Sequence, residues 1–223
     1  MARLFFIGDS ITAGAWDTGG GWANRMIGHI MGETIQAGSK KSTFYCMPYN
    51  LGVSGNAVPD VLKRVKNEVN ARVNVNETVQ IVFSVGVKDS IYLVKENKPL
   101  FSDEEFRKNL TALIDLSLGM TPNVSFIGVL PVNEALLNPI PWTPDKAYVN
   151  TSIKRIEDII GAICASYKLP FYPLFQRWIE MKDYTDFFID GIHPNSKGHA
   201  LLAEQLKIFL LTEDFFKIHS PVR

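Results

Sequence analysis

Short apolar runs alternate with longer amphipathic stretches along almost the whole chain. Five of these runs have the length and composition of buried strands, at residues 3–7, 43–50, 78–85, 124–130 and 169–172. The run at 78–85 is the strongest, because it is rich in β-branched residues. The pattern therefore predicts five short strands.

Apolar residues recur at helical spacing between these runs, at 22–31, 59–73, 102–118, 149–167 and 196–211. Pro59 suits the first turn of its helix, where the missing N–H has no intrahelical partner. Strands alternating with helices predict an α/β fold with a parallel sheet covered on both faces. We expect one domain over residues 1–223, with its ligand at the carboxyl ends of the strands.

Composition narrows the class of protein. Hydrophobic residues make up 46% of the chain and charged residues 21%, which is typical of a globular protein and excludes a disordered or collagenous chain. The 23 lysines and arginines balance 23 acidic residues. Because binding to a polyanionic backbone needs an excess of cations, nucleic acid is not an expected partner.

Targeting signals are missing from the sequence. No run of about 20 apolar residues predicts a membrane span, and the apolar run at residues 4–7 leaves no room for a signal peptide before it. These features favour a cytoplasmic protein. Cys46 and Cys164 have no metal-ligand spacing, so we expect reduced thiols that pack as small hydrophobic groups.

The loop after the first strand offers a candidate nucleophile. It reads Gly8-Asp9-Ser10, which places the Ser10 hydroxyl on the turn out of the strand. Free backbone N–H groups near such a turn stabilise negative charge. The alternative is that Asp9 and Ser10 only cap a helix, and this motif taken alone favours the cap.

A second loop, just before the last helix, changes that balance. It contains Asp190 and His193, three residues apart. A serine needs a base to remove its proton, and imidazole is suitable near neutral pH. The base in turn needs a carboxylate that holds its orientation. Asp190 could instead make a local turn beside an exposed histidine, but two suitable loops at one sheet edge favour serine catalysis.

The remaining histidines, His29, His199 and His219, lack metal-ligand spacing, so we expect them to be packed or solvated and predict no metal site. The sequence contains no glycine-rich phosphate-binding motif, which argues against a nucleotide cofactor. It also lacks the Gly-x-Ser-x-Gly motif of ordinary α/β-hydrolases. The sequence motifs therefore indicate neither a metal nor a nucleotide cofactor.

Three motifs together resemble those of the GDSL, or SGNH, hydrolase family: the Gly-Asp-Ser run ending at Ser10, Gly52 within residues 50–56, and the loop from Asp190 to His193. The resemblance implies a flavodoxin-like, three-layer α/β/α fold with strand order 2-1-3-4-5 and esterase or acylhydrolase activity. It assigns Ser10 as nucleophile, His193 as base and Asp190 as orienting acid. It also assigns the backbone N–H groups of Ser10 and Gly52 as oxyanion donors.

One position departs from the family pattern. The family has Gly-x-Asn-Asp after its third strand, with the Asn side chain as a third oxyanion donor, whereas this chain has Lys88 at that position. Three interpretations compete: a lysine donor, a weakened enzyme, or an inactive module that binds a carbohydrate or acyl ligand. A solvated loop lysine is a fourth. We favour retained activity, because Ser10, Asp190 and His193 are all present. We expect it to be reduced, because lysine is longer and less preorganised than asparagine.

The expected substrate is a small, uncharged carboxylic ester, and zero net charge suits such a substrate. Trp16, close to the nucleophile loop, and Trp142 are candidate substrate-binding residues. Trp142 lies in a proline-rich loop at residues 133–144, which could form a wall of the site or pack its apolar residues on its own domain. The sequence does not identify the natural substrate or the oligomeric state.

Overall fold

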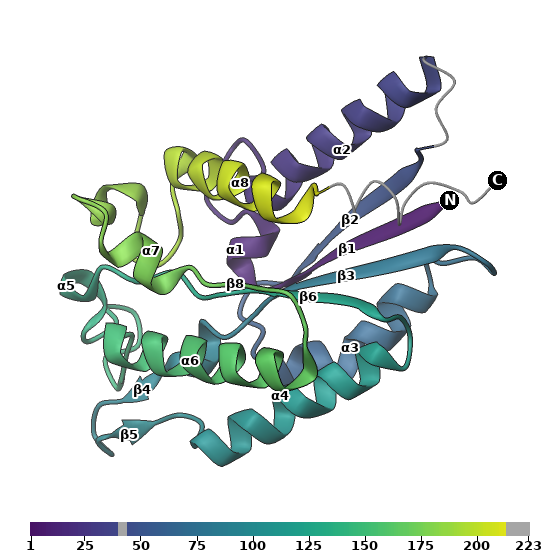
Figure 1. Cartoon of the computed structure of the whole chain (residues 1–223). Helices are drawn as coiled ribbons and strands as arrows, with labels where there is room; N and C mark the ends of the chain where they lie inside the picture. Colours follow the sequence, from purple (N-terminus) through teal and green to yellow (C-terminus); the bar gives the residue numbers. More distant parts are fainter. Residues whose placement is uncertain (40–43, 213–223) are drawn as a thin grey trace.

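Five parallel strands form the central sheet of the computed structural model, which describes residues 1–39 and 44–212 (Figure 1). The spatial order is β2-β1-β3-β6-β8, which confirms the expected order 2-1-3-4-5. Each neighbouring pair is parallel. The strands are β1 (Ala2–Gly8), β2 (Cys46–Gly52), β3 (Thr78–Ser84), β6 (Asn123–Ile127) and β8 (Phe171–Tyr172).

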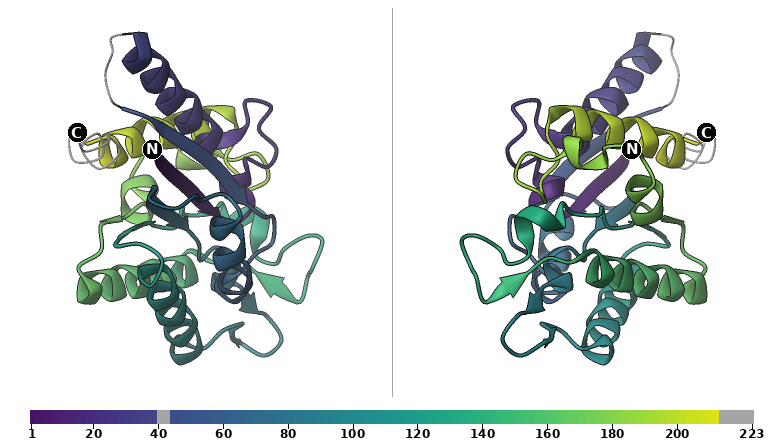
Figure 2. Two further views of the ribbon diagram at one scale, coloured as in Figure 1. Left: turned by 90° about the vertical axis from the view of Figure 1, so that its right-hand side faces the viewer. Right: turned by 90° about the vertical axis from the view of Figure 1, so that its left-hand side faces the viewer.

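Helices cover both faces of this sheet, as Figures 1 and 2 show. One face carries α2 (Gly21–Ser39) and α8 (Ser196–Leu210); the other carries α3 (Val58–Asn70), α4 (Asp103–Leu118) and α6 (Asn150–Tyr167). The predicted α/β/α layering is therefore confirmed. Shorter elements surround the carboxyl ends of the strands: α1 (Ser10–Ala13), α5 (Glu134–Leu137), α7 (Phe175–Ile179), and the 3₁₀ turns η1 (Lys88–Ser90) and η2 (Tyr184–Phe187).

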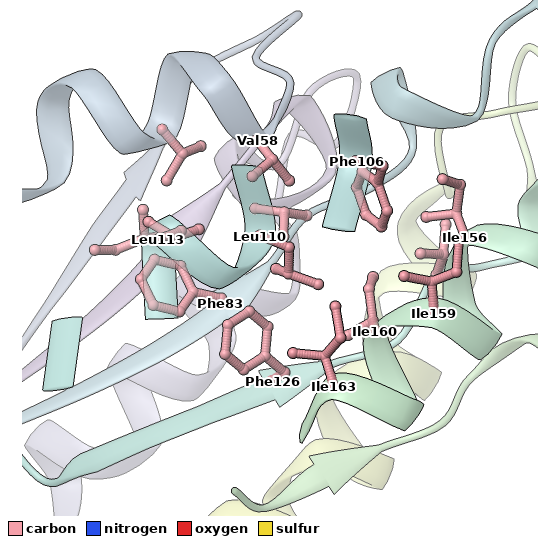
Figure 3. Packing of buried hydrophobic residues seen from close by; sticks show 14 of the residues in the cluster. Val58, Phe83, Phe106, Leu110, Leu113, Phe126, Ile156, Ile159, Ile160 and Ile163 are labelled. Atoms are coloured by element: carbon pink, nitrogen blue, oxygen red, sulfur yellow. The ribbon is translucent and has the colours of Figure 1, made fainter. Parts of the chain in front are cut away.

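Alternating side chains of the strands feed two hydrophobic cores. On β1, Phe5 belongs to the core under α3, α4 and α6, whereas Phe6 belongs to the core under α2 and α8. Figure 3 shows the first core, where Phe83 and Phe126 stack with ring centroids 5.0 Å apart. Because the central strands are buried on both faces, each is a continuous apolar run in the sequence, and the strands could therefore be predicted from this pattern.

A buried carboxylate ties α6 to the carboxyl ends of two strands. Glu157 accepts hydrogen bonds from the backbone N–H groups of Val129 at 2.7 Å, Leu174 at 3.0 Å and Phe175 at 3.0 Å. Desolvation by burial raises the pKa of this carboxyl, against the effect of the three amides. Charge-assisted bonds of this kind hold the segments after β6 and β8 at a defined distance from the helix.

Several predicted bounds were wrong. β2 ends at Gly52 rather than at residue 50, and β6 ends at Ile127 rather than at residue 130. Helix α2 continues to Ser39, well beyond the predicted end. The predicted start of the second strand, Thr43, lies outside the described residues.

A small antiparallel sheet was not predicted. It consists of β4 (Tyr92–Leu93) between β5 (Lys98–Pro99) and β7 (Lys146–Ala147). Two-residue strands are too short to produce a periodic pattern. The sheet joins the segment after β3 to the segment before α6, and it brings both to the carboxyl edge of the main sheet.

Both cysteines are buried and free, Cys46 in β2 and Cys164 in α6. Desolvation by burial raises the pKa of each thiol to about 12. Among the described helices, none combines the length and the apolar character needed to cross a bilayer.

Candidate active site

A serine, a histidine and an aspartate form one hydrogen-bonded chain at the carboxyl edge of the sheet. The Ser10 Oγ lies 2.8 Å from His193 Nε2, although the two residues are 183 positions apart in the sequence. On the other side of the ring, His193 Nδ1 lies 2.6 Å from Asp190 Oδ2. This is the order of contacts in which a carboxylate orients a base and the base contacts a hydroxyl.

The two polar residues after β1 have separate roles. Asp9 is the N-cap of α1, and its carboxylate accepts a hydrogen bond from the Ile11 N–H at 2.9 Å. Desolvation by burial raises the pKa of Asp9 to about 6, despite this bond. Ser10 is the first residue of α1, and its hydroxyl contacts His193 instead. The capping interpretation is therefore correct for Asp9 only.

The Asp190 carboxylate both builds its loop and contacts the histidine ring. Its Oδ1 accepts hydrogen bonds from the backbone N–H of Ile192 at 3.1 Å and of His193 at 2.8 Å. Desolvation would raise the Asp190 pKa, but the bonds from His193 and from these amides outweigh it and lower the pKa below its usual range. An ionised carboxylate beside the ring can stabilise an imidazolium.

The loop that carries His193 is fixed from outside as well. The Asn133 N–H donates to the Gly191 carbonyl at 2.8 Å, and the Asn195 N–H donates to the Phe187 carbonyl at 2.8 Å. Asn195 also caps α8, since its side chain accepts from the Gly198 N–H at 3.0 Å. The histidine is therefore held between the loop after β6 and the start of α8.

The backbone N–H of Gly52, a predicted oxyanion donor, is already used in a hydrogen bond. Gly52 is the last residue of β2, paired with Gly8, and its N–H donates to the Asn50 side chain at 3.0 Å. A Cβ at this position would collide with the backbone of Thr12 and Ala13. Gly52 is needed because α1 packs directly on the strand, and its role as an oxyanion donor stays a prediction.

A second glycine of the same motif, Gly55, lies at the candidate site. It lies three residues further along the same motif and lines the pocket that contains Ser10. Within the described residues, the backbone N–H groups of Ser10 and Gly55 have no acceptor. Because β2 continues to Gly52, the first glycine in the loop after this strand is Gly55.

Lys88 lies in η1 and lines the same pocket as Ser10. It is half-buried, and its ammonium forms no ion pair with any described residue. The neighbouring Asp89 is fully buried, and its carboxylate accepts from the Val58 N–H at 3.1 and 3.2 Å. Desolvation raises the Asp89 pKa to about 7. Asp89 thus anchors η1 to the start of α3 and places Lys88 at the pocket.

Two pockets meet at the histidine. The first, of about 250 Å³, contains Ser10, Ser54, Gly55, Lys88, Lys146 and Tyr148 among its lining residues. The second, of about 820 Å³, is lined by Trp16, Asp17, Thr18, Trp142, Ile189, Asp190 and His193. Trp16, Trp142 and His193 line both pockets, so they form the wall between them.

The tryptophans are exposed at this wall. Trp16 is 68% exposed and Trp142 63% exposed, and the Trp16 ring stands edge-on to the His193 ring with centroids 6.1 Å apart. The loop at 133–144 combines both predicted roles: Leu137 and Ile140 are buried in the core, whereas Trp142 faces the pockets. Buried anchors in such a loop hold an exposed apolar ring in place.

The loop that carries Trp16 is held in an unusual backbone conformation. Trp16 has a φ of 65°, which is rare for a bulky residue. The next residue, Asp17, forms an ion pair with Arg25 and accepts from the Gly21 N–H at 2.9 Å. Arg25 also donates to Ser196 Oγ at 3.0 Å, which connects the loop to α8. These contacts offset the local strain.

His199, expected to be packed or solvated, is fully buried behind this loop and accepts from the Trp22 N–H through Nδ1 at 3.2 Å. Desolvation by burial lowers its pKa to about 4. His29 is only partly buried, whereas His219 lies outside the described residues. In the part of the chain that the structure describes, no group of three His, Cys, Asp or Glu side chains could hold a metal ion.

The buried His199 predicts a specific dependence of stability on pH. Its folded pKa lies below its unfolded value, so the stabilisation is complete above about pH 6.5 and is lost as the pH falls towards 4. We expect the destabilisation caused by His199→Asn to shrink by roughly 2 kcal/mol between about pH 7.5 and about pH 4.5. Urea unfolding of both proteins at the two pH values measures this difference. An identical difference at both values would contradict the buried neutral imidazole.

Sequence reasoning did not single out Ser54, Gly55, Lys146 or Tyr148, although all four line the first pocket. Ser54 and Gly55 belong to the recognised motif at residues 50–56, in which only Gly52 was assigned a role. Lys146 and Tyr148 had no local signal, because the unpredicted small sheet brings them to the site. Their positions depend on pairing between segments that are far apart in the sequence.

Comparisons with known proteins identify a family and a shared fold. The model of the GDSL-like Lipase/Acylhydrolase family matches residues 6–201. A search of curated proteins found no match. Among solved structures, a lipase/acylhydrolase from Enterococcus faecalis has a TM-score of 0.67 at 22% identity, with 92% of this chain and 93% of that chain covered.

Two further structures share the fold. An acetylxylan esterase from Geobacillus stearothermophilus has a TM-score of 0.66 at 17% identity, with 95% of each chain covered. A GDSL-like lipase from Bacteroides thetaiotaomicron has a TM-score of 0.62 at 20% identity, with 92% of this chain and 86% of that chain covered. With the family model spanning residues 6–201, the chain belongs to the GDSL-like lipase/acylhydrolase family.

Proposed function

We propose that the protein is a cofactor-independent serine esterase that cleaves a small carboxylic ester through an acyl-enzyme. The observation that carries the proposal is the hydrogen-bonded chain from Ser10 through His193 to Asp190. Membership of an acylhydrolase family supports the reaction class. The acetylxylan esterase among the structural neighbours supports a short acyl group.

In the first half of the reaction, His193 Nε2 takes the proton of Ser10 as the hydroxyl oxygen attacks the ester carbonyl carbon. Asp190 holds the imidazolium through Nδ1. The tetrahedral intermediate then collapses, the bond to the alcohol oxygen breaks, and His193 gives its proton to the leaving alcohol. In the second half, a water molecule repeats these steps on the acyl-enzyme and releases the carboxylic acid.

The negative charge of the intermediate needs donors in the first pocket. We assign this role to the backbone N–H groups of Ser10 and Gly55, since neither has an acceptor within the described residues. Lys88 lines the same pocket and supplies a third, less preorganised donor. The ester carbonyl occupies the smaller pocket, because Ser10 and Gly55 line that pocket and not the larger one. The larger pocket receives the alcohol portion, and His193, which lines it as well, protonates the leaving oxygen.

The proposal predicts turnover of 4-nitrophenyl acetate and covalent labelling by a fluorophosphonate probe. A fluorophosphonate reacts only with an activated serine, so peptide mapping of the labelled protein should find the modification on Ser10. Release of 4-nitrophenol should stop in proportion to labelling. Labelling of another serine with activity retained would contradict the assignment.

The second candidate is a module that has lost catalysis and binds a carbohydrate or acyl ligand in the same pockets. Lys88, in the family's Asn position, favours it because one oxyanion donor is worth about 10²–10³ in kcat. This module would show neither turnover nor labelling but would bind short carboxylates or oligosaccharides saturably. The same two assays therefore separate the candidates.

A further inference from the structure

Two lysines from separate elements line the pocket that contains Ser10. Lys88 comes from η1 after β3, and Lys146 comes from β7 of the small sheet. Both side chains are half-buried, and neither ammonium forms an ion pair with a described residue. A half-buried lysine packs its aliphatic stem on the protein and keeps its ammonium in contact with water, so both ammonium groups can bind an anion in the pocket.

The pocket offers little negative charge to these lysines. Of the described residues that line it, Asp9 is the one carboxylate, and it is buried and bonded to the Ile11 N–H at 2.9 Å. Asp190 lines the other pocket and is bonded to His193. The small pocket therefore carries two cations against one carboxylate that is already used as a helix cap.

The backbone holds Lys146 at this place. Its N–H donates to the Thr143 carbonyl at 3.0 Å, and its carbonyl accepts from the Ile140 N–H at 2.8 Å. Lys146 also pairs with Leu93 across β7 and β4. Because Ile140 is buried in the core, the stem of Lys146 starts from a fixed point at the mouth of the pocket.

The reaction geometry says which part of a substrate enters this pocket. Of the two pockets, only the smaller is lined by Ser10 and Gly55, so the ester carbonyl lies there. The leaving alcohol takes the pocket of about 820 Å³, which His193 also lines. The acyl group then occupies the smaller pocket with Ser10, Gly55 and the lysines. A volume of about 250 Å³ is enough for a short chain that ends in a charged group.

We propose that the preferred acyl group carries a terminal carboxylate, so that the substrate is a half-ester of a dicarboxylic acid. Lys146 binds this carboxylate, and the attack of Ser10 on the ester carbonyl proceeds as before. Water completes the hydrolysis, releasing the alcohol and the dicarboxylate. This inference rests on the proposed esterase function, and it replaces the uncharged ester expected from a net charge of zero.

Two chromogenic esters of equal chain length test the inference: mono-4-nitrophenyl adipate, which ends in a carboxylate, and 4-nitrophenyl hexanoate, which ends in a methyl group. After subtraction of the uncatalysed rates, we expect kcat/KM to favour the adipate by about tenfold, mainly through KM. The preference should shrink when ionic strength rises from about 0.02 M to about 0.5 M, because salt screens a partly exposed ion pair.

Charge substitutions at Lys146 test the residue itself. We expect Lys146→Gln to remove the roughly tenfold adipate preference and Lys146→Glu to reverse it. Lys63→Gln is the matched control, because Lys63 is an exposed lysine on α3 and does not line either pocket. It should keep the wild-type ratio, and thermal unfolding shows whether each variant is folded.

The outcomes separate this inference from the esterase proposal. If both esters are hydrolysed with equal kcat/KM, or if Lys146→Gln leaves the ratio unchanged, the charge preference is wrong and the esterase stands. If neither ester is hydrolysed, the esterase proposal fails. Calorimetric titration with adipate and hexanoate then tests whether the pocket binds a carboxylate through Lys146. Adipate binding that is lost in Lys146→Gln would support the anion site, and absence of adipate binding would overturn it.

Discussion

Substitution of Ser10 by alanine is expected to lower kcat for 4-nitrophenyl acetate by about 10⁴-fold or more, with little change in KM. The hydroxyl lies 2.8 Å from His193 Nε2, so its removal eliminates the nucleophile and leaves the base without its proton donor. Residual turnover would come from the remaining donors and from water. Steady-state kinetics at saturating substrate measure the loss.

Ser54→Ala is the matched control for this experiment. Ser54 also lines the pocket with Ser10, but its hydroxyl is not within hydrogen-bond distance of His193. We expect Ser54→Ala to keep kcat within about tenfold of wild type. Activity that survives Ser10→Ala but falls with Ser54→Ala would show that the nucleophile is Ser54 and that the assignment to Ser10 is wrong. Matching thermal unfolding midpoints would exclude loss of the fold as the reason.

The layered fold was predictable because the sheet is parallel and buried. Strands such as β1 and β3 are covered on both faces, so their sequences are nearly continuous apolar runs between amphipathic helices. The order of strands did not follow from this pattern; it came from the resemblance carried by Ser10, Asp190 and His193. These residues could be predicted because Ser10 lies two residues after the end of β1, and Asp190 and His193 lie in the short segment before α8.

The remaining site residues depend on details that periodicity does not resolve. The role of Gly52 was taken from the family resemblance, whereas its pairing with Gly8 and the hydrogen bond of its N–H to Asn50 are tertiary contacts that no sequence pattern shows. Lys146 reaches the site through β7, whose two residues pair with β4 about fifty positions earlier. The loop that carries Trp16 is held by the ion pair between Asp17 and Arg25 and by the bond from Arg25 to Ser196 at the start of α8. These contacts join residues that are distant in the sequence, so only the folded structure reveals them.

The largest expected gain in activity comes from Lys88→Asn. A third oxyanion donor is worth about 10²–10³ in kcat when it is preorganised, and a lysine with four rotatable bonds meets this condition poorly. We expect Lys88→Asn to raise kcat for 4-nitrophenyl acetate by about 10- to 100-fold. The backbone should tolerate the change, because Asp89 anchors η1 through the Val58 N–H and the Ser90 N–H donates to the Gly86 carbonyl at 3.0 Å.

Lys88→Met separates the two ways in which the lysine can act. Methionine keeps much of the stem but removes the ammonium, so it leaves only the backbone donors of Ser10 and Gly55. If Lys88 is a weak donor, kcat should follow the order Asn above Lys above Met. If Lys88 contributes nothing, Met and Lys should be equal, with Asn still higher. A large fall for both variants would contradict the expectation, because it would show that the ammonium itself stabilises the oxyanion better than an amide can.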